Sequence, residues 1–139
     1  MGRRILVVEP DDTLRGEVCA YLLSRGHRVE RVSSPREALV RVSFARFDAV
    51  LLNVDAPGGR GLRAVRDLAG GGAPPAVVAV SGSVWAGAEA VRAGARRFLL
   101  RPYAFPEVEE ALCGPPGGAV GGEGAASLPR PPGVARRLH

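Results

Sequence analysis

The sequence predicts an α/β fold with one five-stranded parallel sheet and helices on both faces. Short apolar runs alternate five times with stretches of helical periodicity, and the strand starts recur at similar intervals. The third apolar run, AVLL, is uninterrupted, which is typical of a strand buried on both faces of a parallel sheet. Strands that alternate with helices imply right-handed crossovers and a three-layer arrangement.

The first strand is expected over residues 4–9, an apolar run closed by a carboxylate. Pro10 blocks further pairing at its end. Asp11 or Asp12 is then placed to cap a helix over residues 13–25. The apolar stripe of this helix has helical spacing and comprises Leu14, Val18, Tyr21 and Leu22.

The second unit carries the clearest local signal in the chain. Residues 27–32 alternate as a short strand, with His27 expected at the surface near the turn. Ser34 is an expected N-cap, and Glu37 completes a capping box for a helix over residues 35–44. On its buried face we expect Leu39 together with Val42 or Phe44.

The later elements continue the alternation. They are expected as strand 48–53, helix 61–68, strand 76–80 ending at Ser81, helix 84–93, strand 96–100 and helix 106–112. The last helix has only about two turns. For five such units, the strand order 2-1-3-4-5 is the natural expectation.

The composition divides the chain near Cys113. Gly and Pro make up 12 of residues 113–139, and few large apolar side chains remain there. Such a segment buries too little surface to offset its ordering entropy. We therefore expect a folded domain over residues 1–113 and a disordered tail over residues 114–139. Three tail arginines leave nucleic-acid binding open as a minor alternative: Arg130, Arg136 and Arg137.

Composition also limits the class of protein. No apolar run is long enough for a membrane span, and the N-terminus lacks a secretory signal pattern. Cys19 and Cys113 have no metal spacing and are expected as free thiols. The net charge is +5 and every basic residue is Arg, but the arginines are scattered. These features predict a cytoplasmic protein that does not contact membranes and has no dedicated nucleic-acid surface.

Polar side chains follow four of the five predicted strands. In an open parallel sheet, the carboxyl ends of the strands form the crevice in which ligands bind. The residues expected there are Glu9, Pro10, Asp11, Asn53, Asp55, Ser81 and Arg101.

The motifs in this order resemble the receiver domain of bacterial two-component response regulators, the CheY-like family with a flavodoxin-like fold. The resemblance covers residues 4–112 and rests on ILVVEP, DAVLLNVDAPGGRGL, VAVSG and GARRFLLRPY. It implies a phosphorelay signalling module. The family closes its first strand with two acids, ends its third strand in a phosphate-accepting Asp, and ends its fifth strand in Lys-Pro.

This chain departs from the family at the positions that carry the chemistry. Asn53 matches the phosphate-accepting Asp, and an amide has no anionic oxygen with which to form an acyl phosphate. Pro10 matches a direct Mg²⁺ ligand and offers no side-chain oxygen. Of the family's three carboxylates only Glu9 remains, so Mg²⁺ is expected to bind weakly or not at all, and no other cofactor is expected.

The switch positions are matched in type. Ser81 corresponds to the hydroxyl switch and Phe98 to the aromatic switch, although plain core packing also explains Phe98. Arg101 corresponds to the family's Lys, and without a phosphoryl group we expect it to pair with Glu9 or Asp55.

The resulting hypothesis is a pseudo-receiver: a non-enzymatic protein-interaction module that acts without phosphorylation. Its partner face is expected on the fourth helix, fifth strand and fifth helix, where Trp85 and Tyr103 lie; Trp85 falls in a shortened loop or on the first helical turn. One alternative is phosphorylation with Mg²⁺ on Asp55, whose carboxylate would have to swing back into the crevice. Another is a flavodoxin-like small-ligand binder, although the acidic first turn lacks a phosphate cradle and only Ser81-Gly82-Ser83 offers a minor anion site.

Overall fold

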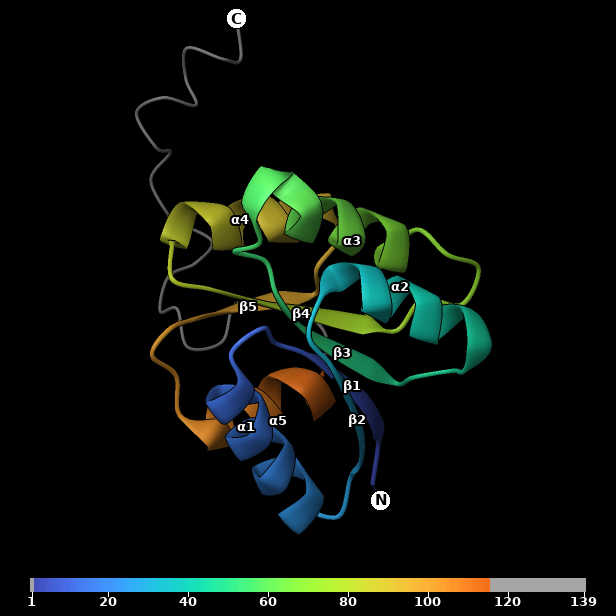
Figure 1. The fold of residues 1–139 in the computed structure, drawn as a ribbon, viewed down its shortest axis with the longest axis vertical. Helices are drawn as coiled ribbons and strands as arrows, with labels where there is room; N and C mark the ends of the chain where they lie inside the picture. The colour runs from blue at the N-terminus through green and yellow to red at the C-terminus, as the bar shows by residue number, and fades with distance from the viewer. Residues whose placement is uncertain (1, 116–139) are drawn as a thin grey trace, which may run out of the picture.

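The computed structural model describes residues 2–115 and contains one sheet of five parallel strands in the order β2-β1-β3-β4-β5, as predicted. Figure 1 shows the strands and helices alternating along the chain. The strands are β1 (Arg4–Val8), β2 (Arg28–Val32), β3 (Ala49–Asn53), β4 (Ala76–Ser81) and β5 (Arg97–Leu100). The helices are α1 (Asp12–Ser24), α2 (Pro35–Phe44), the 3₁₀ turn η1 (Pro57–Gly59), α3 (Arg60–Ala69), α4 (Val84–Ala93) and α5 (Phe105–Cys113).

Helices cover both faces of the sheet. α2, α3 and α4 lie on one face, and α1 and α5 lie on the other (Figure 1). Each face has its own apolar core. Leu6, Leu52 and Phe98 belong to the first, and Ile5, Leu51 and Leu99 belong to the second. Neighbouring residues of a strand therefore point into opposite cores, as the two-residue period of a strand requires.

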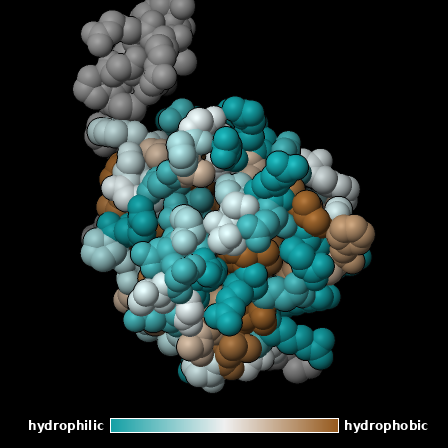
Figure 2. Space-filling model, in the orientation of Figure 1, coloured by the Kyte–Doolittle hydropathy of each residue, from teal (hydrophilic) through white to brown (hydrophobic). Residues whose placement is uncertain are grey.

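The outer surface is largely polar. The face in Figure 2 is mostly hydrophilic, with hydrophobic side chains in small groups. Within residues 2–115, no helix is both long and apolar enough to cross a bilayer. The large hydrophobic side chains with the greatest exposure are Leu23, Val40, Phe44 and Val91.

The predicted caps are present. Asp11 caps α1, because its Oδ1 accepts a hydrogen bond of 2.8 Å from the backbone N–H of Leu14. Ser34 caps α2 by accepting from the N–H of Glu37 at 3.2 Å, while Glu37 accepts from the Ser34 hydroxyl at 3.1 Å. The bonds from the N–H groups of Leu14 and Glu37 satisfy backbone donors that the first helical turn leaves open. The predicted capping box differs in its second half, because the Glu37 carboxylate accepts from the hydroxyls of Ser33 and Ser34 and not from the Ser34 backbone N–H.

The prediction that His27 lies at the surface is wrong. His27 is 8% exposed; its Nδ1 accepts from the N–H of Arg3 at 3.0 Å, and its Nε2 lies 2.8 Å from Glu109 Oε2. Glu109 belongs to α5, far away in the sequence, so local pattern carried no sign of this contact. The His27 hydrogen bond is the largest cause that lowers the pKa of Glu109, which Arg25 lowers further.

Smaller differences concern element ends. Phe44 is 79% exposed, so Val42 and not Phe44 packs inward on α2. α5 has nine residues and is therefore longer than the two turns expected. Cys19 and Cys113 are free, as predicted. The predicted tail lies outside the described residues from residue 116 onward.

Candidate functional site

The site lies at the carboxyl edge of the sheet, where parallel pairing aligns the strand ends. The register pairs Val8 with Leu52, Asn53 with Val80, and Ser81 with Leu100. Residues that follow these positions are therefore brought to one edge. Glu9, Asn53, Asp55, Ser81 and Arg101 lie together there, as the sequence predicted.

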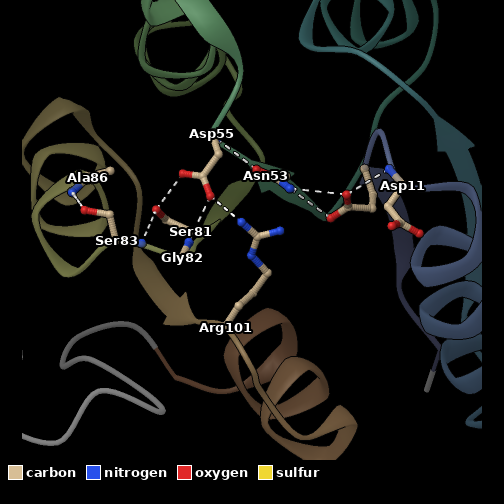
Figure 3. Close-up of polar contacts among 9 residues, drawn as sticks. Asp11, Asn53, Asp55, Ser81, Gly82, Ser83, Ala86 and Arg101 are labelled. Carbon is tan, nitrogen blue, oxygen red and sulfur yellow. Dashed lines mark hydrogen bonds and ion pairs between the residues drawn. The ribbon is translucent and has the colours of Figure 1, made fainter.

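Asn53 and Glu9 form a buried acid–amide pair (Figure 3). Asn53 Nδ2 donates to Glu9 Oε1 at 3.1 Å and to Oε2 at 3.2 Å. The N–H of Asp11 donates to Glu9 Oε2 at 3.0 Å, and Asn53 Oδ1 accepts from the N–H of Asp55 at 2.8 Å. Every polar atom of the Asn53 side chain therefore has a partner, and the Glu9 carboxylate accepts from both the Asn53 amide and the Asp11 N–H.

The Asp55 carboxylate lies in the crevice. Its Oδ1 accepts from the Ser81 hydroxyl at 2.6 Å, and its Oδ2 accepts from the N–H of Gly82 at 2.9 Å and from the Arg101 guanidinium (Figure 3). The sequence placed Asp55 among the residues of this edge but expected that its carboxylate would have to swing back from the loop, whereas that carboxylate already lies in the crevice. Arg101 pairs with Asp55, one of the two partners that the sequence left open.

The backbone after β3 explains the position of Asp55. The N–H of Val54 donates to Val80 O at 2.9 Å, so the ladder continues one residue beyond Asn53. Residues two apart on an extended strand share a side, so Asp55 lies on the side of Asn53. Gly61 then permits the return of the chain, because an added Cβ would lie 2.5 Å from Val54 O. The two-residue period was the signal in the sequence that could have placed Asp55.

Ser81 links the crevice to helix α4. Its Oγ also accepts from the N–H of Ser83 at 2.9 Å, and Ser83 Oγ caps α4 by accepting from the N–H of Ala86 at 3.3 Å. One turn further, Gly87 lies against the ring of Phe98, which is fully buried. The two switch-type positions are therefore joined through the first turns of α4.

The residues at this edge do not fit a divalent cation. Pro10 is exposed and brings no oxygen ligand from its side chain. Within residues 2–115, no group of three or more His, Cys, Asp or Glu residues is placed to hold a metal ion. The Glu9 carboxylate is already bound by an amide and a backbone N–H, and Asp55 by Arg101. Hard cations such as Mg²⁺ require several oxygen ligands with carboxylate charge.

Two contributors were missed at the sequence level. Arg15 Nη1 donates to the backbone carbonyl of Glu9 at 2.8 Å and so ties α1 to the end of β1. The Gly82 N–H donates a hydrogen bond to the Asp55 carboxylate. From the sequence, Ser81-Gly82-Ser83 was expected only as a minor site for an anion. Neither role has a local pattern, because a backbone donor and a long flexible side chain find their partners only in the folded chain.

Trp85 and Tyr103 lie on separate elements. Trp85 lies on the first turn of α4 and is half-buried. Tyr103 is half-buried in the segment between β5 and α5, where burial, and to a smaller extent the Glu9 charge, raises its pKa to about 12. A shallow depression next to the crevice is lined by Leu14, Gly82, Arg101, Pro102 and Tyr103.

Comparison with known proteins decides the family. Residues 5–113 match the response regulator receiver domain. The chain belongs to the response regulator receiver domain family. It is 32% identical over 111 residues to the two-component response regulator PhoP of Pseudomonas aeruginosa, covering 78% of this chain and 49% of PhoP. It is 36% identical over 110 residues to the response regulator MprA of Mycolicibacterium vanbaalenii, covering 78% of this chain and 48% of MprA.

Solved receiver structures have the same fold. The receiver domain of the sensor histidine kinase PA1611 from Pseudomonas aeruginosa, with a magnesium ion coordinated in its active site cleft, superposes with a TM-score of 0.72 at 25% identity over 81% of this chain and 95% of that one. The chemotaxis response regulator CheY4 of Vibrio cholerae gives a TM-score of 0.70 at 23% identity over 81% of this chain and all of CheY4, 100%. This receiver domain spans about half the length of the curated relatives it matches.

Proposed function

We propose that this receiver domain acts in two-component signalling as a protein-interaction module that does not depend on phosphorylation. The observation that carries the proposal is the Asn53–Glu9 pair. Asn53 stands where the family places its phosphate acceptor, and both of its polar atoms are bound within the protein. An amide offers no carboxylate nucleophile to a phosphoryl donor.

The metal requirement of phosphoryl transfer supports the same conclusion. The receiver of PA1611 is described with magnesium in its cleft. In this chain Pro10 and Asn53 replace two of the expected ligand carboxylates, and the remaining Glu9 is occupied by hydrogen bonds. The same edge of the fold is therefore a poor site for Mg²⁺, which needs carboxylate charge in octahedral geometry.

The partner proposed for this module is another protein, in the cytoplasm. The surface we assign to it is formed by α4, β5 and α5, with Trp85 and Tyr103 as its aromatic residues. Aromatic side chains that are half-buried in the free protein supply contact area at low entropy cost. Pull-down with the wild type and a Trp85→Ala variant tests this assignment.

Phosphoryl transfer is tested directly with acetyl phosphate and Mg²⁺. We expect the intact mass to stay unchanged, and we expect beryllofluoride with Mg²⁺ to leave the amide NMR spectrum unchanged. The Pro10→Asp/Asn53→Asp double variant restores both carboxylates and serves as the positive control, because it should gain Mg²⁺ binding. A stoichiometric gain of one phosphoryl group by the wild type would refute the proposal.

One observation favours a second candidate, in which Asp55 is the acceptor: its carboxylate already lies in the crevice. Against this candidate, both Asp55 oxygens accept hydrogen bonds. Attack of this carboxylate on a phosphoryl donor would break its charge-assisted hydrogen bond with Arg101. If the wild type gains a phosphoryl group, the Asp55→Ala variant decides between the two acids. Loss of the adduct in that variant assigns it to Asp55.

A further inference from the structure

We propose that the Ser81 hydroxyl, the Gly82 N–H and the Arg101 guanidinium form an oxyanion-binding site, and that the chain fills this site permanently with the carboxylate of Asp55. The internal ligand then holds the first turn of α4 and Phe98 in one arrangement. This inference rests on the proposed function, because it explains how a receiver fold keeps one state without a phosphoryl group.

The three donors converge on one anion. Ser81 Oγ lies 2.6 Å from Asp55 Oδ1, and the Gly82 nitrogen lies 2.9 Å from Oδ2, which also accepts from Arg101. A hydroxyl, a backbone N–H and a guanidinium are the donor types that bind phosphate and sulfate as well as carboxylates. The site therefore has the chemistry for a tetrahedral oxyanion, but a side chain of the protein already occupies it.

Gly82 leaves room for this close approach. A Cβ added at Gly82 would lie 3.2 Å from Arg101 Nη2 and 3.7 Å from Asp55 Oδ2. The absence of a side chain lets the guanidinium reach the carboxylate directly beside the backbone donor. The Arg101–Asp55 pair therefore lies directly beside the loop after β4.

The neutral amide at position 53 makes room for the second acid. Asp55 donates its N–H to Asn53 Oδ1 at 2.8 Å, so the two residues are direct neighbours. A carboxylate at position 53 would add a third negative charge beside Glu9 and Asp55, and the guanidinium of Arg101 is already paired with Asp55. Like charges at such separations disfavour the ionised forms. Asn53 therefore avoids a like-charge contact beside Asp55.

The contact continues from the crevice into the interior. Ser81 Oγ donates to Asp55 and accepts from the N–H of Ser83, and Ser83 caps α4. Gly87 of α4 lies against Phe98: a Cβ there would come within 2.3 Å of the ring. Removing the Asp55 carboxylate thus frees the Ser81 hydroxyl and loosens the cap of α4.

Titration of an Asp55→Ala variant with inorganic phosphate, followed by amide NMR, tests the site. We expect saturable shifts at Gly82 and Ser83, with affinity at least roughly tenfold higher than for wild type, because the competing intramolecular ligand is gone. Sulfate should give the same shifts. Asp67→Ala removes an exposed acid on α3 and controls for net charge; it should respond like wild type. Asp55→Ala/Arg101→Gln should lose the binding.

Amide hydrogen exchange provides the second readout. In Asp55→Ala without anion, exchange should accelerate at Ala86 and Gly87 and stay unchanged in α1, and phosphate should slow it again. Asp55→Asn, which keeps the side-chain shape, replaces the Ala variant if the latter does not fold. An Asp55 variant that binds phosphate no better than wild type would overturn this inference and leave the proposed function intact. A phosphoryl adduct on the wild type would overturn the proposed function, and an adduct on Asp55 itself would overturn this inference as well.

Discussion

The Asn53 amide nitrogen lies within 3.2 Å of both carboxylate oxygens of Glu9, and both residues are buried. The pair carries a single negative charge, which the N–H of Asp11 also contacts. A buried carboxylate that accepts hydrogen bonds is tolerated, whereas two buried carboxylates at this separation repel each other.

Asn53→Asp should therefore destabilise the protein at neutral pH. We expect a loss of about 1–3 kcal/mol in the free energy of unfolding at pH 7, because a bonding contact becomes a like-charge contact. The repulsion requires both carboxyls to be ionised. The loss should thus be present at neutral pH and disappear as the pH falls below about 4, where carboxyls are protonated in the unfolded chain. Urea unfolding, monitored by Trp85 fluorescence, measures this loss in the free energy of unfolding. Equal stabilities of variant and wild type at pH 7 would contradict the expectation.

Gly87→Ala should disturb the contact between α4 and β5. An added Cβ would lie 2.3 Å from Phe98 Cδ1 and 2.5 Å from Cε1, so the ring or the helix must shift. Overpacking of this kind costs about 1–3 kcal/mol. Gly16→Ala on α1 is the matched control, because its added Cβ would have nothing within 4 Å. At position 16 the higher helix propensity of Ala should increase the free energy of unfolding by up to about 1 kcal/mol. Thermal unfolding should shift in opposite directions for the two variants.

Ser34→Ala should remove the cap of α2. The N–H of Glu37 loses its acceptor at 3.2 Å, and we expect a cost of about 1 kcal/mol. Ser43→Ala on the same helix is the control, since Ser43 is exposed and, among residues 2–115, its hydroxyl hydrogen-bonds only to the carbonyl of Val40. Urea midpoints of the two variants make the comparison; similar midpoints would show that the cap contributes little.

Glu30→Gln should reduce stability at neutral pH and leave it nearly unchanged in acid. Hydrogen bonds from Arg4, and then from Arg41, lower the pKa of Glu30 in the folded protein. A lowered carboxyl pKa contributes stability that is present above the unfolded value of about 4.3 and is lost as the pH falls through the folded value. For partly exposed pairs the effect is below about 1 kcal/mol.

Urea midpoints at pH 7 and pH 3 measure this difference for Glu30→Gln. Glu17→Gln is the control, because Glu17 is exposed on α1 and forms no ion pair with the other residues between 2 and 115. If the difference in urea midpoint between Glu30→Gln and wild type is the same at pH 7 and pH 3, the effect comes from packing and not from charge.

Much of the fold followed from local pattern. The AVLL run and the Ser34–Glu37 capping box predicted β3 and the start of α2, because burial on both faces and cap chemistry act over a few neighbouring residues. The strand order and the meeting of Glu9, Asn53, Ser81 and Arg101 followed from topology, since parallel strands end at one edge. The surface placement of His27 failed, because its partners come from the N-terminal strand region and from α5.

The sequence alone determined the succession of strands and helices and the edge at which the polar residues meet. Residue identity and short-range periodicity are enough for these. Only the tertiary structure decided that Arg101 forms its ion pair with Asp55 and that the Asn53 amide donates its hydrogen bonds to Glu9. Such choices depend on the directions of side chains from three different strands, and these directions exist only once the sheet and its loops have packed.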